Sequence, residues 1–238
     1  MKSMVLFLRS FFFCLLFYTW SVFVLTFFLW TIFFPKKVGN FVPTLWAHGN
    51  FVLLNLFGMK VKVEGRENLP KQNGYLVAAK HQSAMETVLL HALVPNTVYV
   101  LKKSLMLLPL AGIYFWSTGC IPINRSKGTS AMRYMMSLAK KRLKEGFNII
   151  IFPEGTRCEP HTKTKYNPGV AFIYEQCNAP VVPIALNTGF CWPKNSFKKY
   201  AGTTTIRILP PIPAGLEKRE FLHQIESQIE SACEQIKP

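Results

Sequence analysis

The stretch "AKKRLKEGFNIIIFPEGTR", Ala139 to Arg157, combines three structural signals in nineteen residues. Basic residues followed by Gly146 are typical of the last turns and the end of a helix. The apolar run Phe147 to Phe152 then predicts a buried strand. Pro153 and Gly155 predict a tight turn directly after that strand. A helix, a buried strand and a polar loop in this order indicate an α/β domain.

The same alternation continues through most of the chain. Strands are predicted at 60–65, 75–80, 97–102, 120–124, 147–152, 181–186 and 203–209, and helices at 84–94, 129–145, 168–177 and 217–236. The 238 residues suffice for one domain with an appendage. We therefore expect residues 59–238 to form an α/β domain with a mixed central sheet and flanking helices.

The N-terminal segment predicts contact with lipid. Ser10 to Phe34 contains no charged residue, and about 20 apolar residues suffice for a helix to cross a bilayer. A signal peptide should have a shorter apolar core and a small-residue cleavage site, whereas "FFPKKVGN" follows here. The stretch Phe41 to Phe57 is apolar but interrupted, and it can return the chain as an interfacial or re-entrant helix. Residues 1–58 are thus predicted to form a membrane-embedded helix or helical hairpin.

Charge and cysteine content restrict the possible partners. The net charge is +16, and all 12 acidic residues are Glu. Such a field attracts nucleic acid, an anionic membrane surface or a phosphate-bearing substrate, although a solvated basic face is an equally simple interpretation. The six cysteines show no C-x-x-C spacing, which argues against zinc sites and disulfide frameworks. Reduced thiols facing the cytoplasm are expected, and no metal site is predicted.

The stretch "KHQSAMETVLL", Lys80 to Leu90, contains a histidine five residues before a carboxylate. Ser83 and Glu86 have the spacing of a capping box at a helix start. Glu86 in the first turn can also reach back to His81, fix its tautomer and leave the other ring nitrogen free to take a proton. If the substrate supplies the hydroxyl, such a pair can catalyse direct acyl transfer.

Two further polar loops follow predicted strands. "GCIPINRSK" delivers Arg125 and Lys127, and "FPEGTR" delivers Arg157, whose planar fork suits a phosphate. Each loop alone is equally consistent with a surface turn. Because ligands in open α/β sheets lie outside the carboxyl ends of strands, we expect these loops and His81 to form one site.

The segments "HQSAME", "GCIPINR", "FPEGTR" and "VPIA" (182 to 185) resemble, in this order, the four blocks of the glycerolipid acyltransferase family. Their arrangement is most similar to the bacterial 1-acyl-glycerol-3-phosphate acyltransferases. The resemblance covers roughly Lys60 to Leu209. One departure is the acid of the first block, usually Asp in the family and Glu86 here, whose side chain is one methylene longer.

This resemblance implies a reaction and a set of site residues. His81 would be the general base that deprotonates the free glycerol hydroxyl of 1-acyl-glycerol-3-phosphate, and Glu86 would orient it. The hydroxyl would attack an acyl thioester, acyl-CoA or acyl carrier protein, to give phosphatidic acid without a metal or cofactor. The residues that match the acceptor and acyl-chain positions are Arg125, Glu154, Gly155, Thr156, Arg157 and Pro183.

Two alternatives remain open at this point. The acceptor can be another lysolipid, such as a lyso-ornithine lipid or a lysophospholipid. A different class is a non-enzymatic, membrane-anchored module whose basic face binds nucleic acid or anionic lipid, although the sequence has no nucleic-acid-binding motif. The expected partners are therefore a membrane lipid acceptor, an acyl thioester and an anionic bilayer surface, with no nucleic acid. The expected location is the cytoplasmic (inner) membrane, with the catalytic domain facing the cytoplasm.

Overall fold

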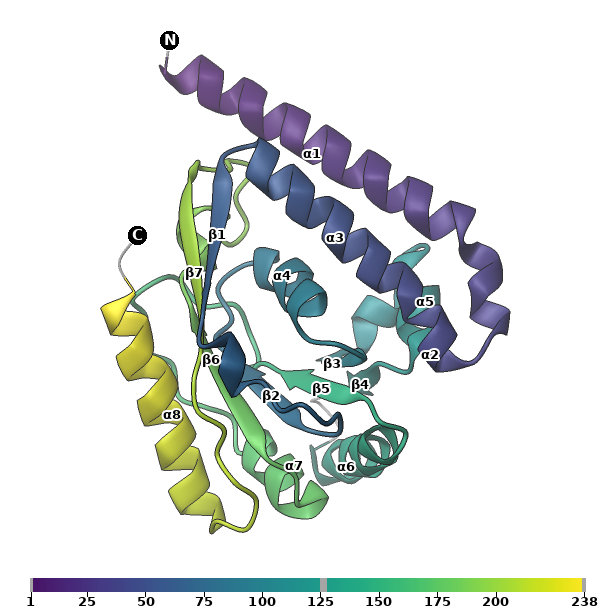
Figure 1. Cartoon of the computed structure of the whole chain (residues 1–238), viewed down its shortest axis with the longest axis vertical. Coiled ribbons are helices and arrows are strands. Elements are labelled where there is room, and N and C mark those ends of the chain that lie inside the picture. The colour runs from purple at the N-terminus through teal and green to yellow at the C-terminus, as the bar shows by residue number, and fades with distance from the viewer. Residues whose placement is uncertain (1, 125–127, 237–238) are drawn as a thin grey trace.

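The computed structural model describes residues 2–124 and 128–236, and within them seven strands form one sheet (Figure 1). The strands lie in the order β1-β7-β6-β2-β5-β3-β4, and every neighbouring pair is parallel except β6 and β7. Their bounds are β1 Met59–Glu64, β2 Leu76–Ala79, β3 Thr97–Lys102, β4 Ile121–Ile123, β5 Asn148–Ile151, β6 Val181–Leu186 and β7 Gly202–Ile208. Each overlaps a strand predicted from the sequence, which confirms the α/β fold with a mixed central sheet.

Helices cover both faces of this sheet. Their bounds are α4 Met85–Leu93, α5 Ala111–Thr118, α6 Gly128–Lys144, α7 Gly169–Cys177 and α8 Lys218–Gln235, with short 3-10 turns η2 Arg66–Asn68, η3 Lys103–Leu107 and η5 Thr188–Phe190. Of these five described helices, α4, α6, α7 and α8 match predicted helices. Helix α5 was not predicted, because its sequence "AGIYFWST" is a short apolar run without helical periodicity.

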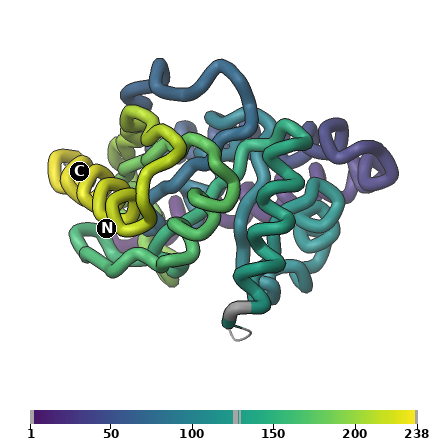
Figure 2. The backbone as a smooth tube through the Cα atoms, turned by 90° about the horizontal axis from the view of Figure 1, so that it is seen from below, coloured from purple at the N-terminus to yellow at the C-terminus, as the bar shows by residue number. Residues whose placement is uncertain are grey.

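Side chains that alternate along the central strands build two apolar cores. Ala78 and Ile149 face one core, which they share with α6, α7 and α8. Val77 and Ile150 face the other core, which they share with α4 and the N-terminal helices. Seen from below, α6, α7 and α8 lie in front of the sheet and α1 lies behind it (Figure 2). The buried strands are therefore enclosed on both faces, as parallel sheets require.

The N-terminal segment folds as a helical hairpin. Helix α1 Lys2–Phe27 lies along α3 Phe41–Leu56, and the two are joined by η1 Leu29–Phe33 and α2 Lys36–Gly39 (Figure 1). Pro43 does not break α3, because it lies in the first turn, where its missing N–H has no intrahelical partner. A side chain at Gly49 would collide with the Trp20 ring, so this glycine allows the close approach of the two helices.

The hairpin is fastened to the domain on one side and exposed on the other. Phe13 of α1 and Leu54 of α3 are fully buried in the core that contains α4. Ser10 accepts the backbone N–H of Lys199, and Arg9 donates to the Lys199 carbonyl. Within the described residues one helix, at Ser3–Phe27, is long and apolar enough to cross a membrane by length and composition. These properties fit membrane association, with α1 held firmly against the α/β domain.

Candidate active site

The loops after β2 and β5 meet at one edge of the sheet. These strands are parallel neighbours, so their carboxyl ends lie together, and the backbone N–H of Cys158 donates to the carbonyl of His81 at 2.7 Å. A cavity of about 890 Å³ opens beside them, bounded by α1, α4, α5, α6 and α7. Its walls are predominantly apolar and include His81, Gly155 and Arg157. A mainly apolar cavity with a few polar groups is typical of a ligand site.

His81 and Glu86 are in direct contact. His81 Nδ1 lies 2.8 Å from Glu86 Oε1, which is the contact predicted from the sequence. The Glu86 carboxylate is an acceptor, so Nδ1 carries the proton in this pair and Nε2 keeps its lone pair. Among the described residues Nε2 has no hydrogen-bond partner. His81 is therefore arranged to accept a proton at Nε2.

Glu86 also caps the helix that carries it. Its Oε1 accepts the backbone N–H groups of Gln82 and Ser83, both at 2.7 Å, and Ser83 Oγ accepts the N–H of Met85. The bond from the Ser83 N–H to Glu86 is one half of the predicted capping box, but Ser83 Oγ accepts the N–H of Met85 and not that of Glu86. Helix α4 begins at Met85 with Ala84 at its N-cap, one residue later than predicted. The cap and the histidine contact coexist.

The "PEGTR" turn presents only some of its residues to the cavity. Gly155 has φ +70°, a left-handed conformation that glycine adopts without strain. Gly155 and Arg157 line the cavity, and Arg157 Nη2 lies 3.5 Å from Asn195 Oδ1. Thr156 is exposed to solvent outside the lining, and Glu154 is buried behind the turn. Arg157 is thus the cationic side chain that this turn contributes to the cavity wall.

Of the other two predicted residues, Pro183 lies away from the cavity, and Arg125 is not among the residues that the structure describes. Pro183 lies inside β6, paired with Ala78 of β2, and is not part of the cavity lining. Arg125 lies outside the described residues, although Ile123 before it and Gly128 after it both line the cavity. The segment that leads into α7 also reaches the cavity, through Asn167, Pro168, Gly169 and Val170.

Sequence reasoning missed Thr188, which donates its hydroxyl to Glu86 Oε2 at 2.6 Å. Thr188 follows β6, which is parallel to β2, so its position at the carboxyl edge of the sheet was the available signal. Glu86 therefore has four donors around a fully buried carboxylate, counting His81, Gln82, Ser83 and Thr188. This number of donors holds the carboxylate in one position.

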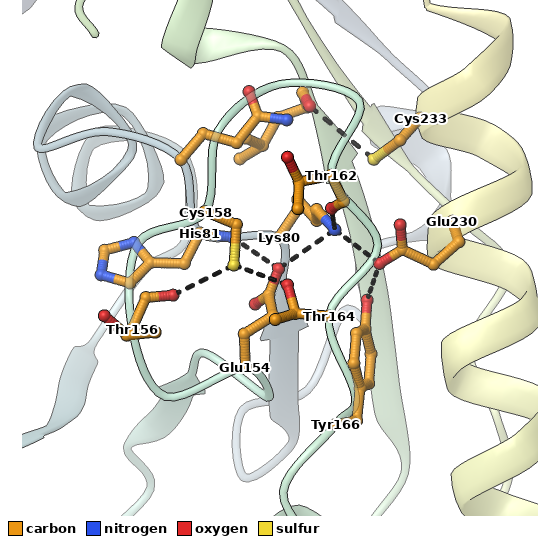
Figure 3. Close-up of polar contacts among 12 residues, drawn as sticks. Lys80, His81, Glu154, Thr156, Cys158, Thr162, Thr164, Tyr166, Glu230 and Cys233 are labelled. Atoms are coloured by element: carbon orange, nitrogen blue, oxygen red, sulfur yellow. Dashed lines mark hydrogen bonds and ion pairs between the residues drawn. The ribbon is translucent and has the colours of Figure 1, made fainter. Parts of the chain in front are cut away.

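A buried polar cluster behind His81 was also missed. Lys80 Nζ donates to Glu230 Oε1 at 2.6 Å and to the Thr162 carbonyl at 3.2 Å, and it lies 3.3 Å from Glu154 Oε1 (Figure 3). Tyr166 donates its hydroxyl to Glu230 Oε1 at 3.0 Å. Burial raises the pKa of Glu154, and the nearby Lys80 opposes that shift. Burial also disfavours the charged form of Lys80, but its hydrogen bond to Glu230 and the charges of the Glu154 and Glu230 carboxylates raise its pKa overall.

The wall of the cavity also contains neutral polar rings. His91 and Tyr99 both line it and stack with their planes at 17°. Burial, helped by the charge of His48, lowers the pKa of His91 to about 4. His91 is therefore uncharged at neutral pH, as suits a predominantly apolar cavity. Among the described residues no group of three or more His, Cys, Asp or Glu side chains is placed to hold a metal ion.

A family model described as Acyltransferase matches residues 60–187. The 1-acyl-sn-glycerol-3-phosphate acyltransferase of Pseudomonas aeruginosa is 32% identical over 174 residues, covering 73% of this chain and 67% of that protein. The 1-acyl-sn-glycerol-3-phosphate acyltransferase alpha of Ovis aries is 28% identical over 162 residues, covering 66% of this chain and 56% of that protein. The match thus spans little more than half of the mammalian relative.

A solved structure has the same fold. The crystal structure of the 1-acyl-sn-glycerophosphate (LPA) acyltransferase PlsC from Thermotoga maritima superposes with a TM-score of 0.81. The match covers 99% of this chain and 97% of that one, at 24% identity. At this identity the likeness concerns the fold, including its N-terminal helices.

Proposed function

Because this chain belongs to the acyltransferase family, we propose that it transfers an acyl chain from an acyl thioester to the free glycerol hydroxyl of 1-acyl-glycerol-3-phosphate, giving phosphatidic acid. The observation that carries this proposal is the His81–Glu86 pair beside a large apolar cavity. The family is one of enzymes, which favours catalysis over the basic binding module that charge alone allows.

In the proposed reaction His81 acts as the general base. Nε2 takes the proton of the glycerol hydroxyl while the hydroxyl oxygen attacks the thioester carbonyl carbon. The resulting imidazolium donates through Nδ1 to Glu86, whose charge stabilises it. When the tetrahedral intermediate collapses, the carbon–sulfur bond breaks and the leaving thiolate takes the proton from Nε2. The products are the ester and a free thiol, and the base is regenerated.

Acceptor and acyl chain have different candidate sites. Arg157 offers a planar, permanently charged fork to the acceptor phosphate, which favours 1-acyl-glycerol-3-phosphate over a lysolipid without phosphate. Apolar side chains from α1, α5 and α6, among them Phe17, Phe115 and Met132, offer a lining for an acyl chain. Gly155 lines the cavity beside Arg157. The resemblance also gives Arg125 and Thr156 a role in binding the acceptor, and we propose that role for both residues.

A membrane location suits these substrates. The exposed apolar face of α1 is accompanied by Leu107 of η3 and Trp116 of α5, which are 84% and 71% exposed. Helix α5 packs beside η1 and α2, so these side chains extend the apolar surface of the hairpin. Lys102 and Lys103 precede Leu107 and suit an anionic bilayer surface. We therefore place the enzyme on the cytoplasmic membrane, with its cavity facing cytoplasmic donors, acyl-CoA or acyl carrier protein.

Release of free thiol tests this function. Membranes containing the protein are incubated with acyl-CoA or acylated carrier protein, with and without 1-acyl-glycerol-3-phosphate, and phosphatidic acid is measured by mass spectrometry. Acceptor-dependent release is expected with at least one donor and should vanish in His81→Ala. His223→Ala, an exposed histidine on α8, is the matched control and should retain activity. No acceptor-dependent release with either donor would exclude this reaction and leave the other lysolipids as acceptors.

A further inference from the structure

Glu154 faces away from the cavity, although both of its neighbours line it. Pro153 and Gly155 are in the cavity wall, whereas the Glu154 side chain lies outside it with 0% of its surface exposed. The left-handed conformation of Gly155 reverses the chain at this point. A side chain that reaches neither the cavity nor solvent does not contact an acceptor bound there. The resemblance to glycerolipid acyltransferases assigns Glu154 to the substrate, and its position argues for another role.

The contacts of Glu154 lead to the backbone of His81. Glu154 Oε1 accepts the His81 backbone N–H at 3.3 Å. On the other side of the same residue, the His81 carbonyl accepts the N–H of Cys158 at 2.7 Å. Phe152 lies flat against the imidazole. The segment 152–158 therefore holds the two backbone polar groups and one ring face of His81.

Lys80 connects this contact to the C-terminal helix. Lys80 and His81 follow β2, and side chains alternate along a strand, so the two point to opposite faces of the sheet (Figure 3). His81 joins the α4 side, and Lys80 reaches the α8 side, where its ammonium meets Glu230 and Glu154. An ammonium has three donors, and here Thr162, Glu230 and Glu154 supply three oxygens. The Glu154 carboxylate is thus held between a buried cation and the backbone of His81.

We propose that Glu154 is a positioning residue that fixes the backbone of His81 for proton abstraction, and that Lys80 and Glu230 hold its carboxylate in place. This inference rests on the proposed role of His81 as the base. In this proposal Glu154 does not bind the substrate directly; it acts on the reaction by positioning His81. It also gives α8 a part in catalysis, although α8 does not line the cavity.

Kinetics of two Glu154 variants separate positioning from substrate binding. Glu154→Ala removes the acceptor of the His81 N–H, and a displaced base should lower kcat about 100-fold with the KM for 1-acyl-glycerol-3-phosphate within about twofold of the parent. Glu154→Gln keeps a carbonyl oxygen that can accept the same N–H, so it should retain kcat within about tenfold. A rise in acceptor KM at unchanged kcat, or equal losses in Ala and Gln, would overturn the proposal.

Two glutamates one turn apart on α8 provide a matched pair. Glu230 is largely buried and pairs with Lys80, whereas Glu234 pairs with Lys163 at the surface. Glu230→Gln should lower kcat about tenfold and leave the acceptor KM unchanged, and Glu234→Gln should match the parent. If both variants match the parent, Glu230 has no part in positioning. Lys80 retains one carboxylate in each single variant, so its charge stays compensated, and thermal unfolding in detergent checks that each variant is folded.

Chemical modification of His81 gives a readout that does not need the reaction. Diethyl pyrocarbonate modifies imidazoles. Proteolysis after glutamate cuts at Glu86, between His81 and His91, so mass spectrometry of the peptide that contains His81 separates it from the other four histidines. In Glu154→Ala the loosened loop should raise the modification rate of His81 several-fold, whereas Glu154→Gln should keep the parent rate. Equal rates in all three proteins would overturn the positioning role. If the parent shows no acyl transfer, the proposed function fails, and this comparison still tests the contact between Glu154 and His81.

Discussion

The imidazole of His81 lies against the phenyl ring of Phe152, with ring centroids 3.9 Å apart and planes inclined by 14°. Phe152 directly follows β5, the strand beside β2, so the sheet itself brings the two rings together. The stack fixes one face of the imidazole and the Glu86 hydrogen bond fixes one edge. A partial rotation of the ring would break both contacts and a half-turn would break the Glu86 bond, so Nε2 is held in a single orientation.

The charge of Glu86 should matter more than its ability to cap α4. Glu86→Gln removes the charge that stabilises the imidazolium, and kcat should fall by between about 10²- and 10⁴-fold, as in other histidine–carboxylate pairs. Glu86→Asp keeps the charge and should lose about tenfold, because the shorter side chain retreats from its donors. Ser83→Ala is the control: it removes one capping bond, should cost about 1 kcal/mol of stability, and should leave kcat near the parent value. Full activity in Glu86→Gln would show that Glu86 only caps the helix and has no part in catalysis.

Arg157 should act on the acceptor and not on the thioester. Arg157→Ala removes the cationic side chain that the turn offers to a phosphate, so the KM for 1-acyl-glycerol-3-phosphate should rise at least about tenfold. The KM for acyl-CoA should change little. Arg66→Ala, an exposed arginine outside the cavity, should match the parent. Equal increases in both KM values would contradict the assignment.

The size of the cavity should set the preferred acyl chain. Ala131 of α6 lines the cavity, and Ala131→Leu fills part of it with a larger apolar side chain. The ratio of kcat/KM for long donors to that for short donors should fall by roughly tenfold, which is the scale of steric discrimination in apolar pockets. Ser137→Leu, on the exposed side of the same helix, is the control and should keep the parent ratio. An unchanged ratio in Ala131→Leu would exclude this cavity as the binding site of the acyl chain.

The exposed apolar side chains beyond α1 should contribute to membrane binding. Leu107→Glu combined with Trp116→Glu places two charges on a surface proposed to contact lipid, and sedimentation with anionic vesicles should show weaker binding. Both side chains are exposed, so folding in detergent should be unaffected. Tyr134→Glu changes a side chain of α6 that is 55% exposed, and it should bind as the parent does. Equal binding of all three proteins would limit the membrane contact to the hairpin.

His91 should make the protein less stable in acid. Its pKa in the folded protein, about 4, lies below its ordinary value of about 6.5 because of burial. The unfolded chain therefore binds a proton first as the pH falls, and stability on the order of 3 kcal/mol is lost between about pH 6.5 and 4. His91→Phe has no such group, so its thermal midpoint in detergent should fall less between pH 7 and 4.5. Parallel decreases in both proteins would show that other groups cause the acid sensitivity.

Local patterns in the sequence predicted most of the elements and one central contact. All seven strands were recognisable as short runs rich in β-branched or apolar residues between turns, and the spacing of Ser83 and Glu86 placed the start of α4 to within one residue. The order of the strands depends on packing between distant segments and was not predictable. The direction of Glu154 was equally hidden, because it depends on Lys80 and on Glu230, which lies 150 positions after Lys80. No local periodicity encodes such a contact.

The ion pair between Lys80 and Glu230 also bears on when, during synthesis, the enzyme becomes competent. Helix α1 leaves the ribosome before the α/β domain does and can contact a membrane while that domain is still being made. His81, Glu86 and the turn that follows β5 emerge before α8 does. In a nascent chain that ends before Glu230, Lys80 lacks its closest carboxylate partner. Lys80 is the residue directly before His81, the proposed base. Full acyl-transfer activity should therefore be reached only after α8 has been made, later than the point at which α1 can contact a membrane.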